Sequence, residues 1–382
     1  MAARAGSGSR RLRLCLSGDV MTGRGIDQIL AHPGDPQLHE SWASSALDYV
    51  ALAERAHGPI PRRVADAYIW GAGLEALARL RPDALIVNLE TSITTSGDWE
   101  PKGINYRMHP ANVGCLRAAG VDCCVLANNH VLDWGSRGLL ETLAVLEGAG
   151  IARAGAGRDA AAAWRPAALA TAGGGRLLVS AVGLASSGIP AHWAAADDRP
   201  GVAWAAAPGP RLVAELAARL QALRRPGDLA LVSIHWGGNW GYDIEPEQRA
   251  FARALIDEAG VDLVHGHSSH HPLGFEVHRG RLILYGCGDL LNDYEGIRDR
   301  REYRGDLSLL YAADLDPGSG RLEALTLVPL QIRGLRLRRP RPADAEWLRA
   351  VLARESAACG IEVEHGAGGW LRARWPGAGQ HA

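Results

Sequence analysis

Acidic, amide and imidazole side chains follow five apolar segments of this chain, each where the apolar segment ends. The segments end in Gly18-Asp19, Asn88-Leu89-Glu90, Asn128-Asn129-His130, His235-Trp236-Gly237 and His265-Gly266-His267. Carboxylate oxygens and imidazole nitrogens together suit Mn, Fe or Zn, and a bridging carboxylate can hold two ions close together. Such ions lower the pKa of a bound water and make hydroxide available at neutral pH. The pattern therefore predicts a site for one or two divalent metal ions.

Each piece of this pattern has a simpler explanation when it stands alone. A Gly-Asp pair after a strand is more often a turn, and Asn128-Asn129 could cap a helix. A single His235 is more often a hydrogen-bonded, half-buried histidine, and His270 and His271 could belong to a polar loop. The joint pattern favours the metal site, because the carboxyl ends of strands meet at one edge of an α/β sheet.

The elements that would position these residues alternate between strands and helices. Strands are expected at 12–16, 84–88, 123–127, 177–182, 229–234, 262–265, 282–285, 307–315 and 322–330, with the clearest helices at 210–223 and 246–259. This alternation predicts an α/β layered domain, and the consecutive strands from about 274 to 335 predict a mixed or antiparallel portion at its end. The weakly periodic segment 37–68 is either a cover over a cleft or a surface excursion.

Composition excludes several classes of protein. The 382 residues carry a formal net charge of -1, so no strong field attracts nucleic acid or an anionic membrane. Lys102 is the only lysine, and the six cysteines are scattered in apolar runs, as expected of small buried residues. No stretch approaches the roughly 20 apolar residues of a membrane helix, and residues 1–13 lack the apolar centre of a signal peptide. These features predict a cytoplasmic protein without a membrane segment.

The ordered motifs resemble those of a known family. They are Gly18-Asp19-Val20-Met21, Asn88-Leu89-Glu90, the run A-N-N-H-V-L-D-W-G at 127–135, His235-Trp236-Gly237 and Gly266-His267. Together they resemble the bacterial capsule-synthesis CapA family, which is associated with poly-γ-glutamate synthesis and belongs to the calcineurin-like metallophosphoesterase superfamily. The resemblance spans roughly residues 12–335. It implies a four-layer sandwich of two mixed β-sheets flanked by helices, followed by a small C-terminal helix and strand extension at 336–382.

The resemblance also implies a role for individual residues. It assigns the metal ligands to Asp19, Glu90, Asn129, His235 and His267. His130 would act as general acid or transition-state stabiliser, and Asp133 would orient it. The sequence departs from the superfamily at Met21, which replaces a histidine, and at Glu90, which replaces a bridging aspartate. The second histidine of the last motif is displaced to His270 or His271. We expect substrate contacts from Arg24, Arg107, His109, His270 and His271.

Three functions follow from these expectations. The first is a metal-dependent hydrolase with phosphoesterase-like geometry, acting on an anionic small molecule or a peptide-like substrate. The second keeps the site but hydrolyses or transfers a γ-glutamyl or other peptide-like amide. The third is a non-catalytic accessory protein that binds an anionic polymer or a synthase partner. Nucleic acid is not an expected partner, and the sequence leaves the oligomeric state open, a homo-oligomer included.

Overall fold

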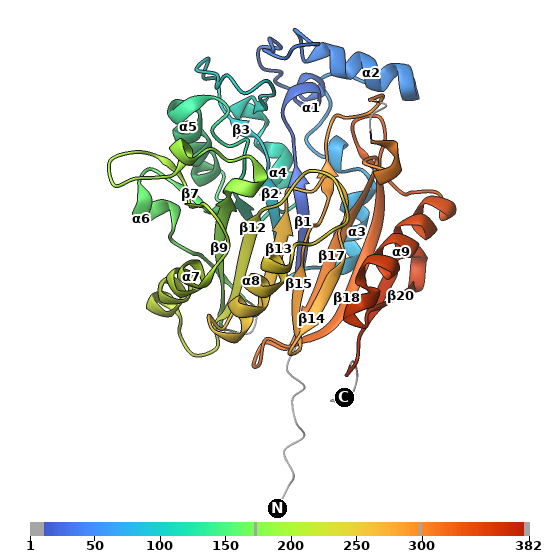
Figure 1. Cartoon of the computed structure of the whole chain (residues 1–382). Helices are drawn as coiled ribbons and strands as arrows, with labels where there is room; N and C mark the ends of the chain where they lie inside the picture. Colours follow the sequence, from blue (N-terminus) through green and yellow to red (C-terminus); the bar gives the residue numbers. More distant parts are fainter. Residues whose placement is uncertain (1–10, 172–173, 298–299, 378–382) are drawn as a thin grey trace, which may run out of the picture.

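Two mixed β-sheets lie face to face in the computed structural model, which describes residues 11–171, 174–297 and 300–377 (Figure 1). In the described part of the chain the larger sheet has ten strands, in the order β20-β21-β18-β17-β1-β2-β5-β6, with β16 beside β1 and β19 beside β18. These strands are β1 (Leu12–Val20), β2 (Ala84–Leu89), β5 (Cys123–Val125), β6 (Ala152–Ala154), β16 (Asp289–Leu291), β17 (Leu307–Leu315), β18 (Leu322–Ile332), β19 (Leu337–Arg338), β20 (Glu362–His365) and β21 (Leu371–Arg374). Strands β1, β2, β5 and β6 are parallel, whereas β17 and β18 run antiparallel. The α/β class is thus confirmed, and the strands expected from residue 307 onward are antiparallel as predicted.

The smaller sheet has the order β11-β9-β12-β13-β15-β14, with β8 beside β9. Its strands are β8 (Ala167–Ala170), β9 (Arg176–Leu184), β11 (Trp204–Ala205), β12 (Leu229–His235), β13 (Leu263–His267), β14 (Phe275–His278) and β15 (Arg281–Leu284). Among the residues that the structure describes, two short pairs lie outside both sheets: β3 (Ser92–Ile93) with β4 (Arg107–Met108), and β7 (Ala156–Gly157) with β10 (Gly201–Val202).

The core between the sheets explains why β12 reads as a continuous apolar run. Leu229 and Leu231 join a cluster that includes Leu14 and Leu16 of β1. The alternate residues of β12, including Val232, join a second cluster formed with the helices outside the smaller sheet. Successive side chains of a strand point to opposite faces, so a strand buried on both faces is apolar throughout.

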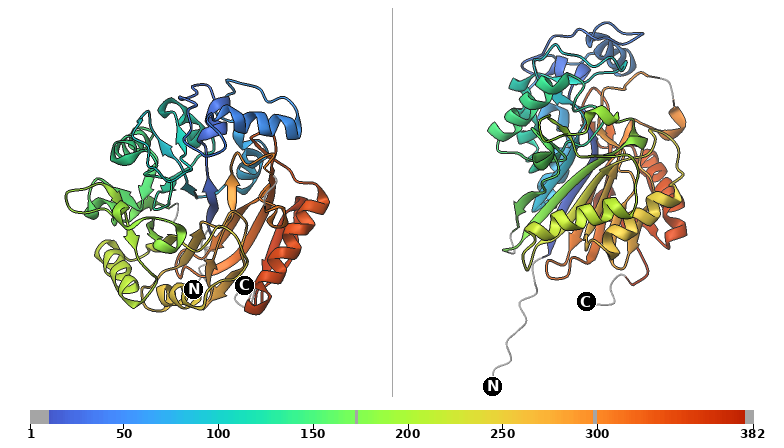
Figure 2. Two further views of the ribbon diagram at one scale, coloured as in Figure 1. Left: turned by 45° about the horizontal axis from the view of Figure 1, so that its top comes forward. Right: turned by 60° about the vertical axis from the view of Figure 1, so that its left-hand side comes forward.

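Helices pack around the two sheets. The α-helices are α1 (Arg24–Ile29), α2 (Leu47–His57), α3 (Ala72–Leu80), α4 (Gly114–Ala118), α5 (Gly135–Gly148), α6 (Ala160–Ala163), α7 (Pro210–Leu223), α8 (Pro246–Asp257) and α9 (Pro342–Ser356). Short 3-10 turns occur at Tyr68–Trp70, Pro110–Asn112, Ala185–Ser187, Ala191–Trp193, Arg301–Tyr303, Ala357–Cys359 and Ala367–Gly369. Helices α7 and α8 pack against the smaller sheet (Figure 2). Helix α8 begins with Pro246 in its first turn and a reciprocal capping pair between Glu245 and Gln248.

The C-terminal segment belongs to the same layers. Strand β21 pairs with β18 of the larger sheet, and Leu348 and Leu352 of α9 belong to the same core cluster as Leu14 and Leu16 of β1. Segment 37–68 contains α2, which packs on α1. None of the helices among the described residues is long and apolar enough to cross a membrane. Residues 1–10, on which the signal-peptide expectation depends, lie outside the described residues.

Candidate metal centre

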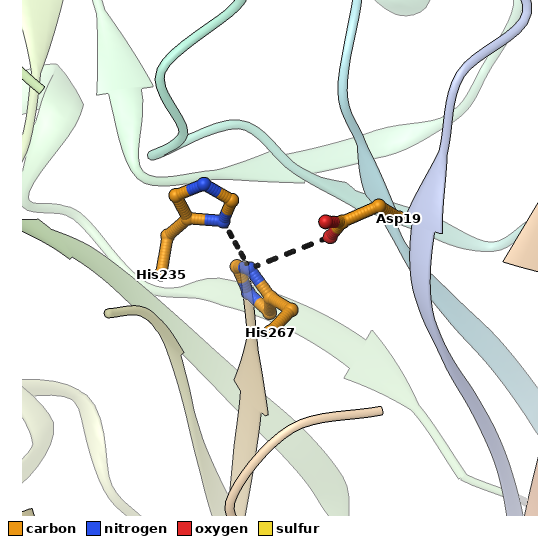
Figure 3. Close-up of side chains that lie close together, drawn as sticks. All are labelled: Asp19, His235 and His267. Carbon is orange, nitrogen blue, oxygen red and sulfur yellow. Dashed lines mark hydrogen bonds and ion pairs between the residues drawn. The ribbon is translucent and has the colours of Figure 1, made fainter. Parts of the chain in front are cut away.

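Three predicted ligands meet between the two sheets: Asp19, His235 and His267 (Figure 3). Asp19 lies at the carboxyl end of β1, whereas His235 and His267 end β12 and β13 and are paired in register. The Nδ1 atoms of the two histidines are 2.7 Å apart, and His267 Nδ1 is 3.9 Å from Asp19 Oδ1. All three side chains are buried. The carboxyl edges of both sheets therefore contribute to one site, as the sequence pattern predicts.

A second group of candidate ligands shares Asp19 with the first. It adds Glu90, His270 and Asp289, and the ligand atoms within each group lie within 4.8 Å of one another. His270 Nδ1 is 2.9 Å from Asp289 Oδ1. Asp289 reaches the site because β16 pairs with β1 in parallel, with Asp289 opposite Asp19. Asp19 belongs to both groups and would contribute a ligand to each if both were occupied.

Asn129 joins the centre through its amide. Its Oδ1 lies 3.0 Å from His235 Nε2, and Glu90 Oε1 lies 3.8 Å from the same nitrogen. The structure therefore brings together all five residues predicted as ligands. It also places His270, predicted to contact substrate, in the second ligand group.

Sequence reasoning missed Asp289, although a signal was available. Gly288-Asp289 repeats the Gly18-Asp19 dipeptide at the end of a predicted strand. The backbones at the two dipeptides pack against each other: the Asp19 N–H donates to the Gly288 carbonyl at 3.1 Å, and a Cβ on Gly18 would lie 1.8 Å from that oxygen. Only glycine fits at position 18, so the close approach of β1 to the start of β16 places both aspartates at the centre.

The electrostatics of the site favour a cation. Asp19 Oδ1 accepts a 2.7 Å hydrogen bond from Asn88, but the buried Oδ2 has no hydrogen-bond partner among the described residues. Burial and the nearby Asp289 carboxylate raise the pKa of Asp19 to about 7, and burial with the neighbouring Asp19 raises the pKa of Glu90 well above its usual value. Grouped, buried carboxylates are costly unless a positive charge compensates them.

The histidines are in the state that a metal requires. Burial lowers the pKa of His235 and of His267 well below the usual value, so both rings are neutral at pH 7. If His235 donates its Nε2–H to the Asn129 amide oxygen and His267 carries its proton on Nε2, no proton remains between the two Nδ1 atoms, which are 2.7 Å apart. Two lone pairs then face each other, and a shared cation would satisfy both. This donor set of imidazole nitrogens and carboxylate oxygens fits Mn, Fe or Zn.

A chain of hydrogen bonds fixes the tautomer of His267. His265 Nε2 lies 2.9 Å from the Ser17 carbonyl oxygen, which can only accept, so Nε2 carries the proton. Burial lowers the pKa of His265 to about 4, so the ring is neutral and its Nδ1 accepts a hydrogen bond from the Ser233 hydroxyl at 3.1 Å. Ser233 Oγ in turn accepts from His267 Nε2–H at 2.8 Å. The lone pair of His267 therefore sits on Nδ1, which faces Asp19 and His235. Sequence reasoning assigned no role to His265 or Ser233.

His130 and Asp133 form a pair beside these ligands. His130 Nδ1 lies 2.6 Å from Asp133 Oδ2, which also accepts from the Tyr106 N–H at 2.6 Å. The Tyr106 ring stacks on His130 with 4.0 Å between centroids. Burial, reinforced by Lys102, lowers the pKa of His130 to about 4 even though Asp133 opposes that shift. The ring is thus held in place and is neutral at pH 7.

The predicted substrate-contacting arginines are engaged by the protein itself. The Arg24 guanidinium is buried, 2.5 Å from Asp293 Oδ1 and 2.9 Å from Glu40 Oε1, and lies over the Tyr49 ring at 3.4 Å. Arg107 donates at 2.9 Å to the carbonyl oxygens of Ser96 and Asp35. Carboxylates already balance the Arg24 charge, and the contact of either arginine with substrate stays a prediction.

The two remaining predicted substrate residues also have local partners. His109 Nδ1 accepts from the Ala111 N–H at 3.2 Å, at the start of the 3-10 turn that follows. His271 stacks on Tyr303 with 4.5 Å between centroids, and its Nε2 is buried without a hydrogen-bond partner among the described residues. Their contact with substrate stays a prediction.

Comparison with known proteins agrees with the motifs. Residues 13–294 match the family described as bacterial capsule synthesis protein PGA_cap. A probable polyglutamine synthesis accessory protein of Mycobacterium tuberculosis (strain H37Rv) is 50% identical over 350 residues, which cover 91% of this chain and 92% of that protein. The PGA biosynthesis protein CapA of Bacillus subtilis (strain 168) is 26% identical over 309 residues, covering 80% of this chain and 68% of that protein. The resemblance read from the sequence is confirmed, and this chain belongs to the bacterial capsule synthesis protein family.

Proposed function

We propose that this chain is a metal-dependent hydrolase that holds one or two divalent ions, Mn, Fe or Zn, between its two sheets. The observation that carries the proposal is Asp19, which belongs to both ligand groups and keeps one buried oxygen without a partner among the described residues. A bound ion would lower the pKa of water and polarise a phosphoryl or carbonyl oxygen of the substrate. Phosphoesterase-like hydrolysis is the reaction that this ligand set and the superfamily resemblance favour.

His130 is the proposed proton carrier. Asp133 holds the proton of His130 on Nδ1, and the pKa of about 4 leaves a lone pair on Nε2 at neutral pH. In this state the ring accepts a proton from the attacking water at Nε2 and then donates it to the leaving group. The acid role expected from the resemblance thus follows a proton-accepting step. General acid–base catalysis of this kind contributes roughly 10²- to 10⁴-fold to rates.

The second candidate reaction has its support in the relatives. One is named an accessory protein of polyglutamine synthesis and another a PGA biosynthesis protein. We infer that this chain assists the synthesis of a glutamate polymer beside a synthase, and that a γ-glutamyl or other peptide-like amide is the alternative substrate. The same donor set would polarise an amide carbonyl. A purely accessory role requires no turnover at all, which separates it from both reactions.

The test uses the full-length protein and measures bound metal by elemental analysis. Turnover is then measured with aryl phosphate esters and with γ-glutamyl amides, for wild type, His235→Ala and Asn129→Ala. His278→Ala is the matched control, because His278 is paired with Asp257, 3.0 Å away, and belongs to neither ligand group. We expect His235→Ala to lose metal and at least about 100-fold in turnover, and His278→Ala to retain both.

The outcomes separate the candidates. Cleavage of phosphate esters alone supports the phosphoesterase, and cleavage of amides alone supports the alternative reaction. Bound metal without turnover of either class supports the accessory role. A correctly folded wild type that binds no Mn, Fe or Zn contradicts the whole proposal.

A further inference from the structure

The single lysine of the chain lies against the His130–Asp133 pair. Of 41 basic residues, all but Lys102 are arginine. Lys102 lies between β3 and β4, and its ammonium group donates to Asp133 Oδ1 at 2.7 Å and to the backbone carbonyl oxygen of Asn129. Its Nζ is also 3.4 Å from His130 Nδ1. A chain that otherwise uses arginine therefore carries its one lysine where a candidate ligand residue and the proposed proton carrier meet.

The contacts divide the Asp133 carboxylate between two partners. Oδ1 accepts a hydrogen bond from the Lys102 ammonium, while Oδ2 lies 2.6 Å from His130 Nδ1. Asp133 is completely buried, whereas the Lys102 side chain is 25% exposed. A buried carboxylate is costly without an opposite charge, and the ammonium of Lys102 is the cation that contacts it. The Lys102 ammonium therefore compensates the Asp133 charge and holds Oδ1, which leaves Oδ2 directed at His130 Nδ1.

Position 102 suits an ammonium better than a guanidinium. An ammonium is a compact charge whose three protons point in different directions, whereas a guanidinium presents its protons in one plane. The Lys102 protons reach a carboxylate oxygen on one residue and a carbonyl oxygen on another, and Nζ lies 5.2 Å from the centroid of the Trp193 ring. An arginine at position 102 would have to place a larger, planar group where the compact ammonium now contacts these two oxygens.

We propose that Lys102 is a positioning residue that holds His130 in its working orientation, acting through Asp133 and the Asn129 carbonyl. The expected effect of Lys102 on turnover depends on the proposed hydrolase function, whereas its positioning of Asp133 and His130 does not. Through its hydrogen bond to the Asn129 carbonyl oxygen, Lys102 connects the loop between β3 and β4 to the turn that carries Asn129 and His130. Without it, Asp133 loses its charge partner, and the Asp133 carboxylate and the His130 ring that it contacts are held less firmly.

The first experiment measures turnover of the metal-loaded, full-length protein. We expect Lys102→Met to lower kcat roughly 10- to 100-fold, because misplacement of a proton-transfer group costs part of its contribution. Metal content should stay at the wild-type level and KM should change less than about threefold, since the Lys102 side chain contacts the Asn129 backbone but none of the candidate ligand atoms. Lys102→Arg should recover less than about a tenth of the lost rate. Arg153→Met is the matched control: Arg153 is 26% exposed and pairs with Glu147, and its kcat should be unchanged.

A double variant tests whether Lys102 acts through Asp133. If it does, Lys102→Met combined with Asp133→Asn should lose less rate than the product of the two single losses. Full additivity would overturn the proposal, as would a wild-type kcat in Lys102→Met or full recovery in Lys102→Arg.

A third measurement needs no activity. Reductive methylation with ¹³C-formaldehyde labels the chain amine and Lys102, which is the only side-chain amine. At fixed pH, the Lys102 methyl resonance should shift in Asp133→Asn and stay in place in Arg153→Met. An unchanged resonance in Asp133→Asn would overturn the proposed contact. A shifted resonance together with an inactive wild type would support the positioning of Asp133 by Lys102 and overturn the hydrolase.

Discussion

Removing one hydroxyl that contacts no candidate metal ion should weaken metal binding. Ser233 links His265 to His267, with Oγ 3.1 Å from His265 Nδ1 and 2.8 Å from His267 Nε2. In Ser233→Ala, both nitrogens lose their partner inside the protein. His267 can then move its proton to Nδ1, which is the atom that must stay free to bind a cation. All candidate ligands remain, but the tautomer is no longer fixed.

The magnitude follows from the role of such outer partners. Loss of a hydrogen bond that orients a ligating histidine costs roughly 10- to 100-fold in metal affinity. This factor corresponds to about 1.4–2.7 kcal/mol of binding free energy. The two unsatisfied buried groups should also lower the free energy of unfolding of the metal-free protein by about 1–3 kcal/mol.

The assay is a competition titration of Zn²⁺ or Mn²⁺ against a chromophoric chelator, with unfolding in urea measured in parallel. Ser180→Ala is the matched control. Ser180 lies on the neighbouring strand β9, in register with Val232, and its buried Oγ has no hydrogen-bond partner among the described residues. We expect wild-type metal affinity in Ser180→Ala. Wild-type affinity in Ser233→Ala, or an equal loss in both variants, would refute the tautomer argument.

Three further predictions concern the same region. Gly18→Ala should lower the free energy of unfolding by about 3 kcal/mol and reduce metal content, because its Cβ would lie 1.8 Å from the Gly288 oxygen. Gly97→Ala, in open space, should do neither, and equal melting temperatures of the two variants would contradict the prediction. In the presence of a chelator, the stability advantage of Asp19→Asn over wild type should grow between pH 4 and pH 7 by roughly 3 kcal/mol in urea unfolding. The sign follows because the folded-state pKa of Asp19 is raised from 3.8 to about 7, so wild type loses stability as pH rises through that window; a constant difference would count against it. Arg24→Met removes the partner of two buried carboxylates, Glu40 and Asp293, and should lower the free energy of unfolding by about 3–5 kcal/mol. A loss below about 1 kcal/mol would contradict this prediction.

The sequence by itself predicted the residues at the carboxyl ends of single strands. Asp19, Glu90, Asn129, His235 and His267 each follow a short apolar run, and a run of this kind ends where its strand ends. Strand periodicity and the shared edge of an α/β sheet are local and general rules. They are sufficient to predict that these five side chains meet, and the family motifs added their expected roles.

Only the tertiary structure decided which distant residues complete the centre. Asp289 lies beside Asp19 because β16 pairs with β1 across 270 positions of sequence, and no local pattern encodes that register. His270 faces Asp289 rather than open solvent. Arg24, predicted to bind substrate, is held by Asp293 and Glu40. Which partner a charged side chain finds depends on long-range packing of the two sheets and their loops, so chain order alone could not assign these contacts.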